Sequence, residues 1–160
     1  MTETYKQKLS YLDNPILSLE IIDFLCGDLL GQGCFRDVYE YPLDPNWVIK
    51  IEMEDGCGEN WSEYRIWGAV METEHKKWFA ECSWISNNGL VMLQKKTEPF
   101  YKDDKKWKKA PDKIPNYFTD IKADNFGWVG KQLICHDYSF TLEKLTSSGG
   151  LTNRMQKFKL

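Results

Sequence analysis

The stretch "GQGCFRDVYEYPLDPNWVIKIE", residues 31–52, decides the fold that this chain is expected to adopt. It is rich in β-branched and aromatic residues, which favour strands. The range 28–42 predicts two strands around a tight turn at Gly31 and Gly33, and the range 46–53 predicts a third strand. Because strands joined by short turns pair in antiparallel fashion, the stretch indicates an antiparallel sheet.

Glycine turns also occur in phosphate-binding sites, because without a Cβ the backbone N–H groups can approach a phosphate closely. Two common sites of this kind are excluded here. Arg36 stands where a Rossmann fingerprint has its third glycine, and a strand rather than a helix is expected after it. No Gly-Lys-Ser or Gly-Lys-Thr sequence occurs, which excludes a Walker P-loop. A glycine turn between antiparallel strands remains, followed by Lys50 in the next strand.

The rest of the chain carries helical and strand patterns without an internal repeat. Apolar residues recur at helical intervals over 57–77, at Trp61, Tyr64, Trp67, Ala69 and Met71. The other expected elements before residue 115 are a short helix over 14–25, a hairpin over 78–94 turning at Asn-Asn-Gly, and a lysine-rich linker over 95–115 with one short helix at 100–109. After it we expect a hairpin over 127–140 turning at Gly130-Lys131, and a tail from Thr141 that contains a flexible break at "TSSGG" and ends basic. This order predicts an α+β fold rather than alternating βαβ units.

Length and composition fit one globular domain. The chain has 160 residues, 42% of them hydrophobic, and a net charge of -3 with a pI near 5.5. The acidic balance argues against a general nucleic-acid binder. No apolar run reaches the roughly 18 residues that span a membrane, and the polar start "MTETYKQKLS" lacks the apolar core of a signal peptide. We therefore expect a cytoplasmic protein without a membrane partner.

The cysteines are scattered and form no C-x-x-C pair, a pattern typical of reduced, packed thiols. Only His75 and His136 could supply imidazole ligands, which argues against a zinc site. Structural thiols are therefore expected at Cys26, Cys34, Cys57, Cys82 and Cys135.

A second polar stretch, "TDIKADNFG" (119–127), predicts either a solvated turn or a place where a charged ligand binds. Lys50 raises a similar question, because a strand lysine either faces solvent or points into a cleft where an opposite charge keeps it ionised. Glu63, on the helix expected next, is the candidate partner. Glu59 is the alternative, but at the start of the helix it is better suited to stabilising the N-terminus.

The order of these motifs resembles the protein-kinase fold, in particular the small, divergent kinase-like proteins common in phage and bacterial genomes. "GQGCFRDVY" is similar to the glycine-rich loop, "VIK" to the strand-3 lysine motif, "DIKADN" to the catalytic loop and "HDY" to the metal-binding D-F-G triad. The resemblance covers roughly residues 28–140. It implies an N-lobe over 1–94 with an antiparallel sheet and helix C, a linker over 95–115, and a strongly truncated C-lobe over 116–160.

The resemblance also implies a role for each matching residue. Those that would hold ATP are Gly31, Gly33, Lys50 and Glu63. Those that would transfer the phosphoryl group or bind Mg²⁺ are Asp120 as catalytic base, Lys122 as a contact of the phosphoryl group, and Asn125 and Asp137 as metal ligands. Carboxylate and amide oxygens are the ligands that Mg²⁺ prefers, which agrees with these roles.

Several positions depart from the family pattern. Phe118 and Thr119 replace the usual His-Arg, so activation by a phosphorylated loop is not expected. Ser139 replaces the triad glycine, and Arg36, at the third loop glycine, either contacts the phosphates or covers the sheet. The residues after Asp137 are too few for an activation segment and the large helices of a full kinase C-lobe.

Two functions of different classes follow. The first is a small, atypical ATP-dependent phosphotransferase, which the complete set of polar residues favours. The second is a pseudokinase-like protein that docks on a host or cellular protein, in the host cytoplasm if the chain is phage-encoded; the small C-lobe favours it. A third is a relic of the fold, in which the charged residues form only internal salt bridges.

Two further surfaces have alternative interpretations. The lysine cluster over 102–113 binds an acidic partner or a nucleic-acid backbone, or else it forms a solvated helix face, which its interleaved aspartates favour. Trp61 and Trp67 are expected in the core, whereas Trp107 and Trp128 are expected to be exposed contact residues.

Overall fold

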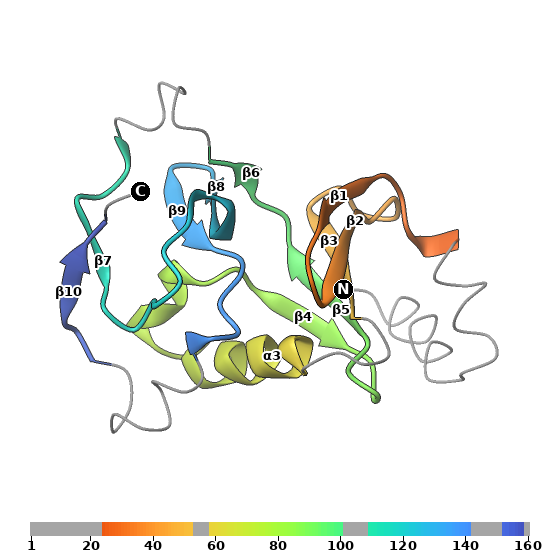
Figure 1. Cartoon of the computed structure of the whole chain (residues 1–160), viewed down its shortest axis with the longest axis horizontal. Coiled ribbons are helices and arrows are strands. Elements are labelled where there is room, and N and C mark those ends of the chain that lie inside the picture. Colours follow the sequence, from red (N-terminus) through yellow and green to blue (C-terminus); the bar gives the residue numbers. More distant parts are fainter. Residues whose placement is uncertain (1–23, 53–57, 101–108, 142–151, 159–160) are drawn as a thin grey trace. The chain divides into compact units, whose positions relative to one another are not determined.

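The computed structural model describes residues 24–52, 58–100, 109–141 and 152–158. It has a mixed α+β fold of antiparallel sheets with helix α3, Glu59–Val70 (Figure 1). The chain divides into two compact units, of which the first comprises Met1–Trp61 and Cys82–Lys95 and the second comprises Ser62–Glu81 and Lys96–Leu160. Helix α3 begins in the first unit and continues in the second.

The first unit contains a five-stranded antiparallel sheet in the order β1-β2-β3-β5-β4 (Figure 1). Its strands are β1 Leu29–Gln32, β2 Arg36–Glu40, β3 Trp47–Glu52, β4 Cys82–Ile85 and β5 Val91–Lys95. A hydrogen bond from Gly33 N to Arg36 O, 2.9 Å long, closes the β1–β2 turn. Gly89 turns the β4–β5 hairpin with a φ of 77°, a conformation that favours glycine. The strands expected over 28–42, 46–53 and 78–94 are confirmed.

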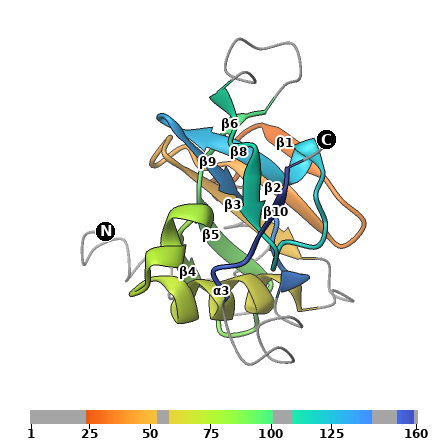
Figure 2. The same ribbon diagram turned by 90° about the vertical axis from the view of Figure 1, so that its left-hand side faces the viewer.

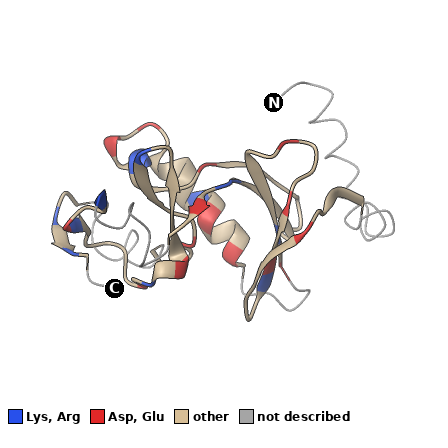
Figure 3. Cartoon of the chain, turned by 90° about the horizontal axis from the view of Figure 1, so that it is seen from above, with Lys and Arg blue, Asp and Glu red and all other residues tan. Residues whose placement is uncertain are grey.

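The two faces of this sheet differ in polarity. An apolar cluster covers one face, formed by Leu25, Tyr41, Ile49, Val91 and Leu93. Because side chains alternate along a strand, the intervening positions face the other way. Lys50, Glu52 and Gln94 are among them, and all three are buried. Figure 3 shows charged positions of both signs in the strands of this sheet. The candidate lysine therefore lies on a buried face that carries polar residues beside the apolar Val48 and Met92.

The second unit contains two small antiparallel sheets. One consists of β6 Glu98–Pro99, β8 Phe126–Val129 and β9 Gln132–Cys135; the other is the ribbon of β7 Lys113–Pro115 and β10 Met155–Lys157 (Figures 1 and 2). The hairpin expected over 127–140 is confirmed, with a turn at Gly130 (φ 61°) and Lys131. The range 95–115, predicted as a linker, contributes β6 and β7.

Aromatic side chains pack together in the second unit. Phe79 contacts three of them, with ring centroids 5.6 Å from Tyr117, 5.1 Å from Phe118 and 5.0 Å from Tyr138. Phe118 directly precedes the polar stretch 119–127, and Tyr138 directly follows Asp137. The aromatic cluster therefore anchors the flanks of both motifs in one core.

Helix α3 ends at Val70, earlier than the range 57–77 predicts, and the 3₁₀ helix η2, Glu74–Trp78, follows it. Its most buried positions are Asn60, Glu63, Ile66 and Val70. Trp61 is 36% exposed, so the expectation of a core tryptophan there is wrong. The buried positions recur at intervals of three and four residues, as one face of a helix does, but two of them are polar. The apolar pattern therefore identified the helix and missed its buried face.

The remaining expectations are tested only in part. Trp128 is 3% exposed and packs on Phe100, so the expectation of an exposed contact residue is wrong. The described cysteines are free thiols at Cys26, Cys34, Cys82 and Cys135. Cys57, Trp107, most of the lysine cluster, the helix at 100–109, most of the tail and all of the 14–25 helix except Phe24 and Leu25 lie outside the described residues. Within the described ranges, no helix has the length and apolar character that crossing a membrane requires.

Candidate functional site

Three positions align across the sheet of the first unit. In the register of the strands, Gly31 pairs with Val38, and Val38 pairs with Lys50. Because neighbouring strands are about 4.8 Å apart, the backbones at Gly31 and Lys50 are separated by roughly 10 Å. The glycine turn and the strand lysine therefore belong to one region of the sheet.

The two glycines of the turn differ in their surroundings. A Cβ at Gly33 would lie 3.1 Å from Arg36 O, tighter than an ordinary contact. At Gly31, a Cβ would meet no heavy atom within 4 Å, and the φ angle is not in the left-handed region. Among the described residues, a side chain at Gly31 would meet open space, and the register of β1 shifts between Leu29 and Gly31.

Lys50 is only 2% exposed, although an alternating strand also allows a solvated lysine. Glu52, two positions along β3, lies on the same face and is 5% exposed. Burying an ammonium group is unfavourable unless polar or charged groups compensate for its lost hydration. Lys50 is therefore enclosed by protein, with Glu52 on the same face and with Val38 and Met92 as its cross-strand neighbours.

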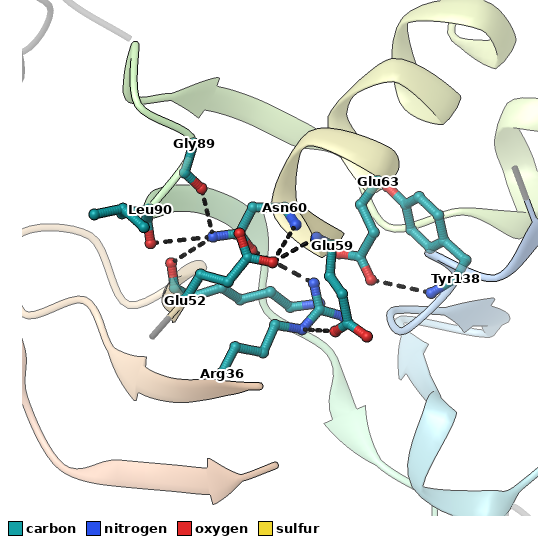
Figure 4. A network of polar contacts seen from close by, with 9 residues as sticks. Arg36, Glu52, Glu59, Asn60, Glu63, Gly89, Leu90 and Tyr138 are labelled. Carbon is teal, nitrogen blue, oxygen red and sulfur yellow. Dashed lines mark hydrogen bonds and ion pairs between the residues drawn. The ribbon is translucent and has the colours of Figure 1, made fainter. Parts of the chain in front are cut away.

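Glu52 extends into a buried network at the start of α3 (Figure 4). Its carboxylate accepts hydrogen bonds from the backbone N–H groups of Glu59 and Asn60, the first two residues of the helix. The Asn60 side chain donates to the carbonyls of Gly89 and Leu90, at 3.1 and 3.2 Å. A carboxylate at this position satisfies free N–H groups and interacts favourably with the helix dipole. The start of α3 is thereby fixed to β3 and to the β4–β5 turn.

Arg36 belongs to the same network. Its Nε lies 3.3 Å from Glu59 Oε2, and its Nη1 donates to Asn60 Oδ1 at 3.4 Å. The residue is 5% exposed. These contacts join Arg36 in β2 to the start of α3, a role that the sequence did not predict.

The stretch 119–127 forms a hydrogen-bonded loop in the second unit, around the 3₁₀ helix η4, Ala123–Asn125. Asp120 Oδ2 accepts from Lys122 Nζ at 2.9 Å and from Asn125 Nδ2 at 3.0 Å. The hydrogen bond from Lys122 to Asp120 raises the pKa of Lys122, and the charges of Asp120, Asp137 and Asp124 act in the same direction. The loop therefore keeps a charged lysine among several carboxylates.

Backbone hydrogen bonds join Asp137 to this loop. The carbonyl of Asn125 accepts from the N–H of His136 at 2.9 Å and from that of Asp137 at 3.4 Å. One residue further, the N–H of Tyr138 donates to Glu63 Oε1 at 3.0 Å (Figure 4). The structure therefore connects five of the candidate residues in one network, namely Glu63, Asp120, Lys122, Asn125 and Asp137.

The orientation of Asn125 suits a bound cation. Its side-chain hydrogen bonds to described residues both use Nδ2, so Oδ1 is the atom that can serve a ligand. Asp137 is half-buried and is held beside Asn125 by the backbone contact. Because Mg²⁺ prefers carboxylate and amide oxygens, these two residues fit the ion that the resemblance implies.

No protein-family model and no curated protein matches this sequence. The roles of the candidate residues therefore stay predictions that rest on residue pattern and geometry. The first unit contains Gly31, Gly33 and Lys50, and the second contains the five connected residues.

Sequence reasoning missed the residues that hold the candidates in place. Glu52 and Asn60 resemble ordinary surface polar residues in the sequence, although they are 5% and 0% exposed. Thr97 and His136 form a hydrogen bond between positions that no motif connects. The only available signal was that His136 directly precedes Asp137 in "HDY".

Proposed function

We propose that this chain is a small protein-kinase-like protein that binds ATP with Mg²⁺ and transfers its terminal phosphoryl group to a hydroxyl. The observation that carries this proposal is the network in the second unit, from Asp120 through Asn125 to the Asp137 segment and on to Glu63. A base, a cation and two oxygen ligands in one network are what phosphoryl transfer asks of a protein.

In the proposed reaction, Asp120 accepts the proton of the acceptor hydroxyl as the hydroxyl oxygen forms a bond to the γ-phosphorus. The bond between that phosphorus and the β–γ bridging oxygen breaks, and ADP leaves with the electron pair. Among described residues, the Asp120 side-chain contacts use Oδ2, so Oδ1 is the atom assigned to the proton. Lys122 offsets negative charge on the transferred group. Bound Mg²⁺, held by Asn125 and Asp137, would neutralise phosphate charge.

The first unit supplies a separate part of the proposal. Gly31 lies in the edge strand β1 and Gly33 in the turn that follows it, so both leave the backbone without a Cβ in the region where Lys50 supplies a cation. The burial of Lys50, which is 2% exposed, supports a specific role for its ammonium group rather than solvation. These assignments are independent of the network in the second unit, so each is tested by its own substitution.

The alternative is a pseudokinase-like protein that docks on a host or cellular protein without catalysis. One observation favours it: Lys122 and Asp120 form an ion pair of 2.9 Å in which each satisfies the other's charge. A loop whose charged side chains pair with each other can have a structural role without taking part in catalysis. Measuring ATP turnover distinguishes the phosphotransferase from the pseudokinase-like protein.

Thermal unfolding with and without Mg-ATP tests the proposal. At 100 times its dissociation constant, a ligand adds about 2.7 kcal/mol to the free energy of unfolding, which raises Tm visibly. We expect this shift in the wild type, a smaller shift in Asp137→Asn and in Lys50→Met, and an unchanged shift in the exposed control Asp112→Asn. Asp120→Asn should keep the shift and lose ATP turnover. The absence of any shift at millimolar Mg-ATP would refute nucleotide binding.

A further inference from the structure

The imidazole ring of His136 contacts both the loop 119–127 and the segment between β5 and β6. Its Nδ1 lies 2.8 Å from Thr97 Oγ1, and its Nε2 lies 2.7 Å from the carbonyl oxygen of Asp124. A carbonyl oxygen only accepts hydrogen bonds, so Nε2 is the donor of the second contact. Thr97 lies between β5 and β6, whereas Asp124 lies in η4. The ring therefore links two segments of the second unit that are distant in sequence.

His136 also holds the loop through its backbone. Its N–H donates to the carbonyl of Asn125 at 2.9 Å, while its ring contacts the carbonyl of Asp124. One residue thus fixes two consecutive carbonyls of η4, and the next residue along the chain is Asp137. The separation between Asn125 and Asp137, the two proposed metal ligands, consequently depends on where His136 is held.

The packing around Gly127 shows that the position of Thr97 is tightly constrained. A Cβ at Gly127 would collide with Thr97 Oγ1 and would lie 2.6 Å from Thr97 Cβ and 2.7 Å from Glu98 O. The φ of Gly127 is not in the left-handed region. Glycine ends the stretch "TDIKADNFG" because Thr97 occupies the space of a side chain, and that close approach brings the threonine hydroxyl to His136.

We propose that Thr97 and His136 are positioning residues for the metal ligands of this site, with Gly127 providing the space that Thr97 needs. They set the distance between Asn125 and Asp137 without touching the ion or the nucleotide. This inference rests on the proposed function for its consequence in Mg²⁺ binding. The hydrogen bonds of Thr97 and His136 in the unliganded protein do not depend on that function.

Matched substitutions distinguish the effects of the Thr97 hydroxyl and of the His136 ring from those of changed packing. Thr97→Val keeps the shape and removes the hydroxyl, whereas Thr97→Ser keeps the hydroxyl. His136→Leu removes both ring contacts, whereas His136→Gln places an amide donor near the position of Nε2. In the unliganded full chain, the ¹H–¹⁵N resonances of the Asn125 side-chain amide and of the Asp124 and Asn125 backbone amides report the loop geometry. We expect them to shift in Thr97→Val and in His136→Gln, each of which loses the contact between residues 97 and 136, and to shift most in His136→Leu. They should stay near wild type in Thr97→Ser.

The functional readout is the ratio of the ATP dissociation constants measured with EDTA and with Mg²⁺. A purely structural role would not change this ratio in the folded variants. Misplaced ligands should lower it about tenfold in Thr97→Val, His136→Gln and His136→Leu, with recovery in Thr97→Ser.

Each outcome has one meaning. Loop resonances that are unchanged in Thr97→Val and His136→Leu would overturn the inference at its first step. Shifted resonances with an unchanged Mg²⁺ ratio would overturn the positioning role and leave the proposed function intact. If the wild type binds no Mg-ATP, both the proposed function and the positioning role fail, and the resonances still decide whether the unliganded hydrogen bonds exist.

Discussion

Gly31 and Gly127 each lie in a stretch of sequence that contains polar residues, but the space around the two glycines differs. Gly31 has open space where a side chain would be, whereas at Gly127 that space is taken by Thr97 and the carbonyl of Glu98. Close packing therefore explains the second glycine, whereas no packing contact among the described residues explains the first. A glycine that the fold does not need is a better indication of a ligand than one that close packing requires.

The largest expected effect follows from substituting the packed glycine. Gly127→Ala should destabilise the protein by about 3 kcal/mol, because the new Cβ would overlap Thr97 and lie 2.7 Å from a backbone oxygen that cannot move easily. The midpoint of urea unfolding measures the change. Thr97→Ala combined with Gly127→Ala should recover only part of the loss, because Glu98 O remains. A change below about 0.5 kcal/mol, the range of ordinary surface substitutions, would contradict the packing argument.

A somewhat smaller loss is expected from the buried network of the first unit. Asn60→Ala should cost about 2 kcal/mol, because the carbonyls of Gly89 and Leu90 lose a donor while they stay largely enclosed. Asn46→Ala, an exposed asparagine of the same unit, is the control and should change the free energy of unfolding far less. Equal effects of the two substitutions would show that the network at the start of α3 contributes little.

The unexplained glycine should separate stability from binding. Gly31→Ala should change the free energy of unfolding by no more than about 0.5 kcal/mol, since the added methyl group meets no neighbour within 4 Å. If the proposed function holds, the same methyl group should weaken ATP binding about tenfold by keeping phosphate from the backbone. Gly68→Ala, on an exposed position of α3, is the matched control and should gain about 1 kcal/mol without affecting ATP. Calorimetric titration with ATP measures the binding of both variants.

The smallest effect concerns the turn at Asp44, which contains none of the candidate residues. The hydrogen bond from the Asn46 N–H lowers the pKa of Asp44 below its usual value of 3.8. A lowered pKa contributes stability above the unfolded value, and this contribution is lost as pH falls through the folded pKa. Asp44→Asn should therefore cost about 0.3 kcal/mol at pH 7, because the site is exposed, and the difference from wild type should vanish near pH 2. If the difference in stability between Asp44→Asn and wild type grew toward low pH, the lowered pKa of Asp44 would be contradicted.

The strands of this protein were predictable, whereas the partners of its polar residues were not. Apolar residues and turn glycines in the sequence predicted seven of the strands, namely β1, β2, β3, β4, β5, β8 and β9. The ion pair of Lys122 with Asp120 is also local, since two residues separate the pair. The contact of Tyr138 with Glu63 spans 75 positions, and that of His136 with Thr97 spans 39. No short-range pattern encodes contacts of that length.

Helix α3 likewise shows that the sequence can predict an element without predicting which of its residues are buried. Its apolar residues predicted a helix, yet Trp61 is 36% exposed while Glu63 is fully buried. Which side of a helix is buried depends on the groups that meet it, and a carboxylate can be buried there because a backbone N–H satisfies it.

The sequence by itself determined an α+β chain with antiparallel strands, the turns that join them, and the positions of the polar residues that we propose for phosphoryl transfer. Local backbone preferences and the alternation of side chains are sufficient for these conclusions. Only the tertiary structure decided that Lys50 is buried, that Arg36 holds the start of α3, and that Thr97 and His136 fix the loop of "TDIKADNFG". The reason is that burial and long-range hydrogen bonds depend on which segments meet in space, which no single stretch of sequence specifies.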